Sequence, residues 1–434
     1  MHQARHTDTS LQHRASSQGK PHFRRTMQRV KTFLSRVLRA LIRPRNIATT
    51  AVSFLFIHLI QVVAFNTDAL NPVARAFQGF STTDIFYDMM LTAPADTSNA
   101  IVIVDITKLH NRDSIALALE EVDALEPAAI DIDVVFEYPK EQAGDLHLVG
   151  VAATLSNAVF SFKMMDPDRE RKEFTRQVHS FFAQELGLNE GFVNVDRSMT
   201  RNIPLCLEMQ GKAYPSVIAR MMEVLQDEPF DYQNHKSEPI DYEPTVFRVI
   251  PFDSIQQNAR YITGKIVMFG GAYESIDMLY TPIGQKHGIE VLCYALKTML
   301  EKKQQTNCTG WLYWLITLLI AHFAVCCIMA YRSFMGRKKE ELANVQPTKA
   351  IGSPKGIAID VFSTTFFVSM VVFLIMVAYM IVGYVLFDKW RINFDLTPTL
   401  SVMALSIIAN EFVHIAIKHS HNIIRYKGNT NSNS

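Results

Sequence analysis

The chain has 434 residues, of which 48% are hydrophobic, and a formal net charge of +1 at pH 7. This near-neutral total hides a strong segregation. Residues 1–46 hold eleven Lys and Arg against one acid, whereas residues 66–310 hold 21 basic and 35 acidic residues. The basic segment leads directly into an apolar run, where anionic lipid is its nearer partner, so the charge argues against a nucleic-acid-binding protein. Five cysteines without metal-ligand spacing predict neither a disulfide framework nor a bound cofactor.

Four long apolar runs predict transmembrane helices at residues 47–65, 311–331, 361–387 and 396–417. Each run is long enough to cross a hydrocarbon core of about 30 Å. The flanking segments 1–46, 332–359 and 418–434 are rich in Lys and Arg, and such segments stay in the cytoplasm. We therefore expect a multi-pass protein of the bacterial inner membrane, with both termini cytoplasmic and residues 66–310 displayed on the outer, periplasmic side.

The outer segment begins with alternating strand and helix signals. Apolar, β-branched runs predict buried strands at Ile101–Ile106, Ala128–Val135 and Ala158–Lys163. Amphipathic stretches predict helices at Asp113–Leu125 and Gly144–Asn157, with Asp113 as an N-cap. This alternation predicts an α/β fold with a mostly parallel sheet flanked by helices.

The rest of the outer segment adds more elements of both kinds. Further strands are expected at Thr245–Ile250 and Lys265–Phe269, and further helices at Tyr214–Leu225, Asp253–Ala259 and His287–Glu301. Two short β-like pieces, Phe192–Val195 and Ile203–Glu208, predict a hairpin added to the sheet or a small subdomain beside it. Only a short connection, Gln304–Gly310, separates the last helix from the second apolar run, so that helix can pass motion into the membrane.

Four blocks of this region resemble, in order, the second CHASE family of extracellular bacterial sensory domains. The blocks are Ile101–Lys108, Glu126–Glu137, Gly191–Leu205 and Gly264–Leu296. Members typically carry one span before the domain and three after it, which is the layout expected here. The resemblance covers roughly Ile85–Lys303 and implies a signal-input module, usually fused to a histidine kinase or a nucleotide or diguanylate cyclase.

The chain departs from that family in two places. The family commonly has an Asp-Gly-x-x-Arg turn, but the matching segment Asp196–Arg201 lacks the glycine. After the fourth apolar run only the segment 418–434 remains, so we expect no fused output domain. No glycine-flanked serine or paired Cys and His marks a nucleophile, and we therefore expect no enzymatic activity.

Carboxylates near the ends of the predicted strands form the candidate ligand site. Asp131 and Asp133 are two residues apart and point to one face of their strand. Crevices of parallel sheets open at the carboxyl ends of strands, which predicts a pocket lined by Asp105, Asp131, Asp133, Gly270, Gly271 and Asp277. The first three could also hold Ca²⁺ or Mg²⁺, or such aspartates could cap helices. The Gly270-Gly271 backbone could face an anion or form a tight strand-to-helix turn.

The fourth apolar run contains one polar cluster, Asn410, Glu411 and His414. Such groups most often contact another helix, and a partner's spans or a proton path are the alternatives. Taken together, the sequence predicts a sensory receptor, either a monomer or a homodimer, that binds an unknown outer ligand or exported protein. It would relay its state to a separate output protein. A structural subunit of an envelope complex is the main rival, and an exported hydrolase is the third reading.

Overall fold

A computed structural model describes residues 35, 38–65, 81–92, 94–140, 142–168, 173–195, 199–274, 277–302, 305–308, 310–345 and 365–431. Most of the predicted basic arm 1–46, the loop residues 346–359 and the turn residues 196–198 lie outside these ranges. The chain forms two compact units. One unit is Ser81–Asn307 together with Tyr384–Asn393, and the other comprises Met1–Phe80, Cys308–Gly383 and Phe394–Ser434.

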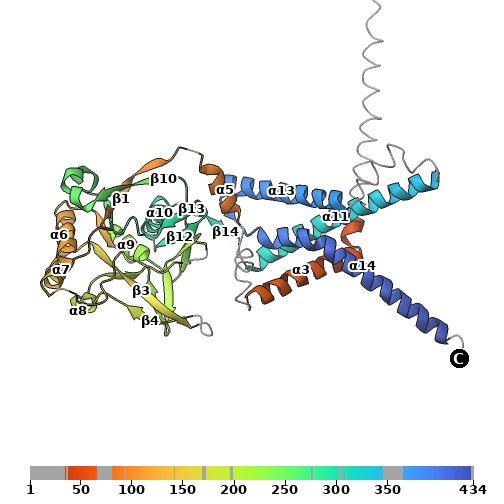
Figure 1. Cartoon of the computed structure of the whole chain (residues 1–434), viewed down its shortest axis with the longest axis horizontal. Helices are drawn as coiled ribbons and strands as arrows, with labels where there is room; N and C mark the ends of the chain where they lie inside the picture. Colours follow the sequence, from red (N-terminus) through yellow and green to blue (C-terminus); the bar gives the residue numbers. More distant parts are fainter. Residues whose placement is uncertain are drawn as a thin grey trace, which may run out of the picture. The chain divides into compact units, whose positions relative to one another are not determined.

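The Ser81–Asn307 unit is built on a seven-stranded sheet (Figure 1). Six strands run parallel, in the order β10 (Thr245–Pro251), β1 (Asp96–Asp105), β11 (Ile266–Gly270), β2 (Ala129–Ile132), β3 (Ala158–Asp168) and β5 (Glu190–Phe192). The seventh strand, β4 (Glu173–Val178), is antiparallel to β3. The predicted α/β fold with a mostly parallel sheet is confirmed.

Helices cover both faces of this sheet, which is why its central strands are apolar throughout. Alternate residues of β1 pack into two separate cores. Val102 and Val104 belong to the core with α6 (Arg112–Asp123) and α7 (Gln142–Thr154). Ile101 and Ile103 belong to the core with α9 (Val217–Gln226) and α10 (Gly288–Glu301). Where the β1–β10 register shifts, the Ile101 N–H donates to Ser98 Oγ at 3.2 Å.

The hairpin predicted from Phe192–Val195 and Ile203–Glu208 is wrong. Instead, β5 joins the main sheet beside β3, β6 (Asn202–Pro204) pairs with β9 (Ser237–Pro239), and β7 (Cys206–Met209) pairs with β8 (Lys212–Pro215). The position of β5 is fixed by Gly191, because a Cβ there would lie 2.4 Å from the Val217 backbone at the start of α9. That close approach requires glycine and holds β5 beneath the helix.

Three smaller expectations also differ from the structure. The N-cap of α6 is Asn111, whose side chain accepts the Ser114 N–H, and Asp113 lies in the first turn instead. The segment after β10 forms 3₁₀ turns, η2 (Phe252–Ser254) and η3 (Gln256–Tyr261), not an α-helix. The chain after β11 leads into a hairpin of β12 (Met278–Thr281) and β13 (Gly284–His287), so the turn at Gly270 is not a strand-to-helix turn.

Two short elements complete this unit. Helix α5 (Thr82–Met90) begins with a capping box in which Ser81 and Asp84 satisfy each other's backbone N–H groups. Strand β14 (Thr306–Asn307) runs parallel to β15 (Ile392–Asn393). The second of these strands comes from the segment Tyr384–Asn393, so residues far along the chain are built into the unit.

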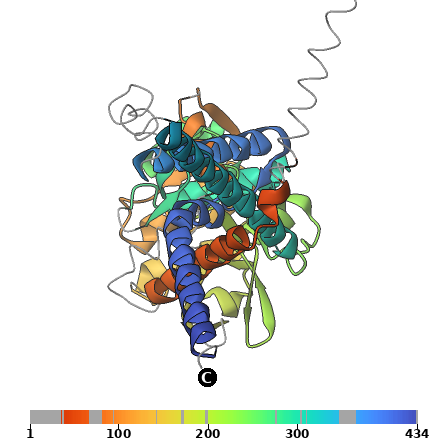
Figure 2. The same cartoon turned by 90° about the vertical axis from the view of Figure 1, so that its right-hand side faces the viewer.

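The other unit consists of long helices, which are seen to cross one another in Figure 2. They are α3 (Pro44–Phe65), α11 (Gly310–Val345), α13 (Thr365–Trp390) and α14 (Thr397–Asn431). Among the described residues, three segments are long and apolar enough to cross a membrane: Gly310–Lys338, Phe366–Trp390 and Thr397–Ile417. Helix α3 contains the predicted first span but is not one of the three, so four spans remain a prediction.

Helix α3 nevertheless packs with the three apolar helices through a shared core. Ile57 from α3 belongs to the same cluster as Val325 from α11, Val372 from α13 and Val402 from α14. Polar side chains add to the contact between α3 and α11, since Thr50 Oγ1 lies 2.8 Å from His322 Nδ1. This packing makes α3 part of one helical cluster with the three apolar helices.

Candidate functional site

Asp105 fastens two loops together. Its Oδ1 accepts the Thr107 N–H and the Ala272 N–H, each at 3.0 Å, and the neighbouring Tyr273 N–H donates to Thr107 Oγ1 at 3.2 Å. The backbone donors after Gly271 that would have faced an anionic ligand are therefore already occupied by groups from the end of β1. Asp105 acts as a structural link between β1 and the loop after β11.

Asp131 lies on the same face of the sheet, beneath α10, and is completely buried. Neither carboxyl oxygen has a hydrogen-bond partner among the described residues. Burial, reinforced by the nearby Asp133, raises the pKa of Asp131 well above its usual range. An unpaired charge at this depth would be very costly, so Asp131 is held neutral. The Cys293 thiol of α10 is affected in turn, because burial and Asp131 raise its pKa.

Asp133 follows the end of β2 and lies against Gly270, with its Cβ 3.1 Å from where a Gly270 Cβ would stand. The pKa of Asp133 is raised to about 7, chiefly by burial and also by Asp277 and Glu274, while Lys163 of β3 lowers it. The Asp277 carboxylate rests directly on Gly288 at the start of α10, where a Cβ would be only 2.0 Å from Asp277 Oδ2. The structure thus brings Asp133, Gly270 and Asp277 together.

With a pKa of about 7, Asp133 can take up and release a proton near neutral pH. This carboxylate cluster differs from the expected cation site, because no group of three or more His, Cys, Asp or Glu within the described part of the chain could hold a metal ion. Gly271 faces Glu274, with a virtual Cβ 2.6 Å from Glu274 Oε1, rather than an open anion site. The residues that the sequence predicted as one ligand site therefore do not share one role. Asp105 links two segments, Asp131 is a buried neutral acid, and Asp133 has a pKa near neutrality.

The polar residues of α14 have unequal surroundings. Asn410 is buried and its Oδ1 accepts from Arg45 Nε at 3.2 Å, while Glu411 forms an ion pair of 2.7 Å with Arg332 of α11. His414 is exposed in this unit. Asn410 and Glu411 thus contact residues of two other segments.

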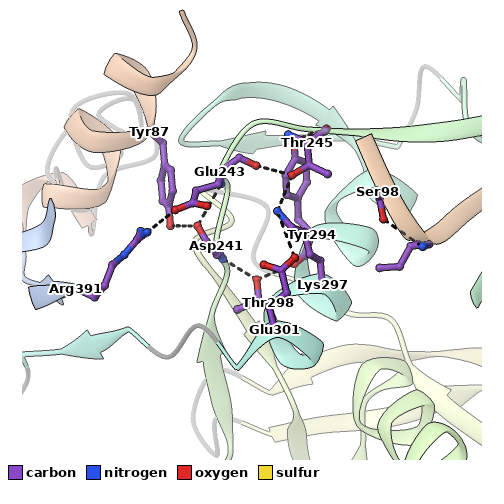
Figure 3. Close-up of polar contacts among 11 residues, drawn as sticks. Tyr87, Ser98, Asp241, Glu243, Thr245, Tyr294, Lys297, Thr298, Glu301 and Arg391 are labelled. Carbon is purple, nitrogen blue, oxygen red and sulfur yellow. Dashed lines mark hydrogen bonds and ion pairs between the residues drawn. The ribbon is translucent and has the colours of Figure 1, made fainter. Parts of the chain in front are cut away.

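A second polar network, missed by the sequence reasoning, lies where the chain enters and leaves the Ser81–Asn307 unit (Figure 3). The buried Tyr87 hydroxyl of α5 donates to Asp241 Oδ1 at 2.8 Å and accepts from Gln305 Nε2 at 2.6 Å. Burial and Asp241 raise the pKa of Tyr87 far above its usual range, so it remains a neutral donor. Gln305 is 8% exposed, which means that the expected connection Gln304–Gly310 is anchored at this residue.

The segment Tyr384–Asn393 completes this network. Arg391 forms an ion pair with Glu243 (Figure 3). Its guanidinium carbon also lies 5.1 Å from the centre of the Phe86 ring. Phe387 is fully buried, with its ring centroid 4.9 Å from that of Phe86. The Thr306 N–H of β14 donates to the Arg391 carbonyl oxygen at 3.0 Å. We call this arrangement of α5, β14 and Tyr384–Asn393 the junction.

Helix α10 is tied directly to the junction. Thr298 Oγ1 accepts the Asp241 N–H at 2.8 Å and donates to the Tyr294 carbonyl at 2.7 Å. Lys297 Nζ donates to Thr245 Oγ1 at 2.7 Å, and the Tyr294 hydroxyl donates to the Thr245 carbonyl at 3.1 Å (Figure 3). Any displacement of the C-terminal half of α10 must therefore disturb groups that hold the junction.

A hollow of about 270 Å³ opens beside the same end of α10. It is lined by α9, α10, the segment that connects α9 to β9, and Glu238 of β9. Thr298 belongs both to its wall and to the hydrogen bonds of the junction. The sequence reasoning placed a pocket at the carboxyl ends of the strands, whereas this hollow adjoins the C-terminal ends of two helices.

A family comparison agrees with the architecture. The family model described as CHASE2 domain matches residues 57–329, which is more than half of the chain. No curated protein and no solved structure matches the chain. The chain belongs to the CHASE2 domain family.

Proposed function

We propose that this protein is a membrane-anchored sensory receptor whose CHASE2 domain binds a ligand outside the cytoplasm and passes its state through the membrane helices to a separate output protein. Family membership and three apolar helices support a membrane protein with a sensory domain. The charge distribution supports the orientation, since Lys and Arg concentrate in the segments expected inside.

The junction is the observation that carries this proposal. Three segments that lead toward apolar helices are joined to one another within this unit. Helix α5 and Tyr384–Asn393 meet through the buried rings of Phe86 and Phe387, and β14 pairs with β15 of the same segment. Because α13 ends at Trp390 and α14 begins at Thr397, the third segment contains the end of one candidate span and the start of its connection to the next. A domain that merely bound another protein would need one tether, whereas three packed segments give its internal state a mechanical route to several helices.

The proposal is tested by disturbing the junction and observing the helices. In the full chain, Ser333→Cys on α11 and Ile415→Cys on α14 would carry nitroxide spin labels, with Cys308 and Cys327 replaced by alanine. Both labelled positions are exposed. The distance distribution between the labels is then measured by pulsed electron resonance in lipid nanodiscs, with and without Arg391→Ala.

Arg391→Ala leaves Glu243 without its cation and loosens the packing on Phe86, so we expect a shifted or broadened distance distribution. The matched control is Arg248→Ala, which removes an arginine stacked 3.8 Å from the Tyr261 ring and outside the junction. If Arg391→Ala and the control both leave the distribution unchanged, the domain does not relay its state, and the envelope-subunit reading is favoured instead.

A further inference from the structure

We propose that the hollow beside α10 binds a zwitterionic free amino acid with an apolar side chain. This rests on the proposed sensory function and names the chemistry of its ligand. A cavity of about 270 Å³ is slightly smaller than the roughly 300–1,000 Å³ typical of drug-sized ligands, so the ligand must be small.

The inner wall of the hollow is apolar. Met222 of α9 is buried, and Phe230 and Met299 are partly buried against the same core. Two methionines and a phenylalanine form an adaptable surface that suits an aliphatic or aromatic side chain of varied shape. An apolar side chain seated here would displace water from all three.

The rim carries charges of both signs, which selects a ligand that also carries both. Lys302 is exposed at the C-terminal cap of α10 and forms no ion pair with any described residue. Glu238 has His235 as its ion-pair partner at a long 3.6 Å, so its oxygens remain available to a further donor. Lys302 can therefore receive a carboxylate, and Glu238 can receive an ammonium group.

Helix ends add to the preference for an ammonium group. The hollow is lined by Gln226 at the end of α9 and by Lys302 just after α10, so two helix C-termini adjoin it. A helix C-terminus carries a partial negative charge that favours a nearby cation. A purely anionic ligand would be repelled by the helix C-termini and by Glu238. A zwitterion can place its ammonium group near them and its carboxylate near Lys302.

The same position explains how binding would be sensed. Thr298 lies in the wall and accepts the Asp241 N–H, and Asp241 in turn accepts from the Tyr87 hydroxyl. A ligand packed against Thr298 and Met299 thus acts on the hydrogen bonds that hold the junction. Occupancy is converted into a change of the segments that lead to the membrane helices.

The test measures binding of L-phenylalanine to the full chain in nanodiscs by titration calorimetry. Two analogues separate the charges: 3-phenylpropionate lacks the ammonium group and phenethylamine lacks the carboxylate. We expect L-phenylalanine to bind about tenfold more tightly than either. Lys302→Gln and Glu238→Gln should each weaken its binding about threefold to tenfold, while the exposed Lys140→Gln control leaves it unchanged.

Measuring each analogue with each rim variant also tests which side chain binds which charged group of the ligand. Glu238→Gln should not weaken the binding of 3-phenylpropionate, which has no ammonium group. Lys302→Gln should not weaken the binding of phenethylamine, which has no carboxylate. The proposal is overturned if L-phenylalanine does not bind at millimolar concentration, if an analogue binds equally well, or if both rim variants bind as tightly as the wild type. Calorimetry reports binding alone, so its failure is distinct from failure of the relay, which appears only in the distances between spin labels.

Discussion

The carboxylate cluster predicts that the sensory domain loses stability as pH rises from about 4 to about 7. Asp133 has a pKa of about 7 in the folded protein against 3.8 as its ordinary value, mainly because of burial. Between these two pH values the unfolded chain has already released the proton while the folded domain still holds it. The folded state is therefore favoured fully below about pH 4, and the advantage is lost progressively up to about pH 7.

The size of the effect follows from the shift. At 1.36 kcal/mol for each pKa unit, the change from 3.8 to about 7 corresponds to about 4 kcal/mol, an upper value because Asp133 keeps some exposure. Asp133→Asn removes this proton, so the variant should lose less stability than the wild type between pH 4 and 8. We expect it to be more stable by about 2–4 kcal/mol at pH 8.

Pulse proteolysis across a urea gradient, performed on the full chain at several pH values, measures this difference. The exposed Asp253→Asn serves as the control for removing one carboxylate. Parallel stability curves for Asp133→Asn and the wild type would refute the reasoning, because they would show that Asp133 releases its proton equally readily in the folded and unfolded states.

Three further outcomes follow from the same structure. Phe387→Ala should lower the unfolding free energy of the Ser81–Asn307 unit by about 3–5 kcal/mol in the same assay, and a loss below about 1 kcal/mol would contradict its place in the core. Excised residues 66–310 should melt at lower temperature than the same segment joined by a flexible linker to residues 384–393; equal melting temperatures by circular dichroism would show that the junction adds no stability. With a membrane-impermeant maleimide, a cysteine at Lys140 should react from outside and one at Lys349 should not, and equal reactivity would overturn the proposed orientation.

Local sequence signals were sufficient for the centre of the sheet. The run Ile101–Val104 is β-branched and buried on both faces in the structure, so its hydropathy alone indicates its environment. The same signal could not decide how the short strands pair, because β5, β6 and β7 have similar composition and their partners depend on contacts elsewhere. Gly191 was the one informative residue, since its lack of a Cβ allows α9 to approach.

The candidate site was harder to predict because its contacts are distant in sequence. Asp105 meets the Ala272 N–H across 167 positions, and Arg391 meets Glu243 across 148. Phe387 lies in the candidate span Phe366–Trp390, as hydropathy predicts, but hydropathy could not show that its ring is buried against Phe86. Apolar character alone does not distinguish a lipid-facing ring from one that fills a protein core.

The late position of Tyr384–Asn393 in the chain has a consequence for biogenesis. During synthesis, Ser81–Asn307 is complete before the segment that closes its core exists, and residues 308–383 must be made in between. At about 5–20 residues per second this interval lasts about 4–15 s. During that time Phe86 lacks its partner ring Phe387, so the domain remains in an unfinished state that chaperones and proteases can recognise. The core of the domain can therefore close only after α13 has been made and inserted. A chain that stalls or misinserts before that helix never acquires a closed domain.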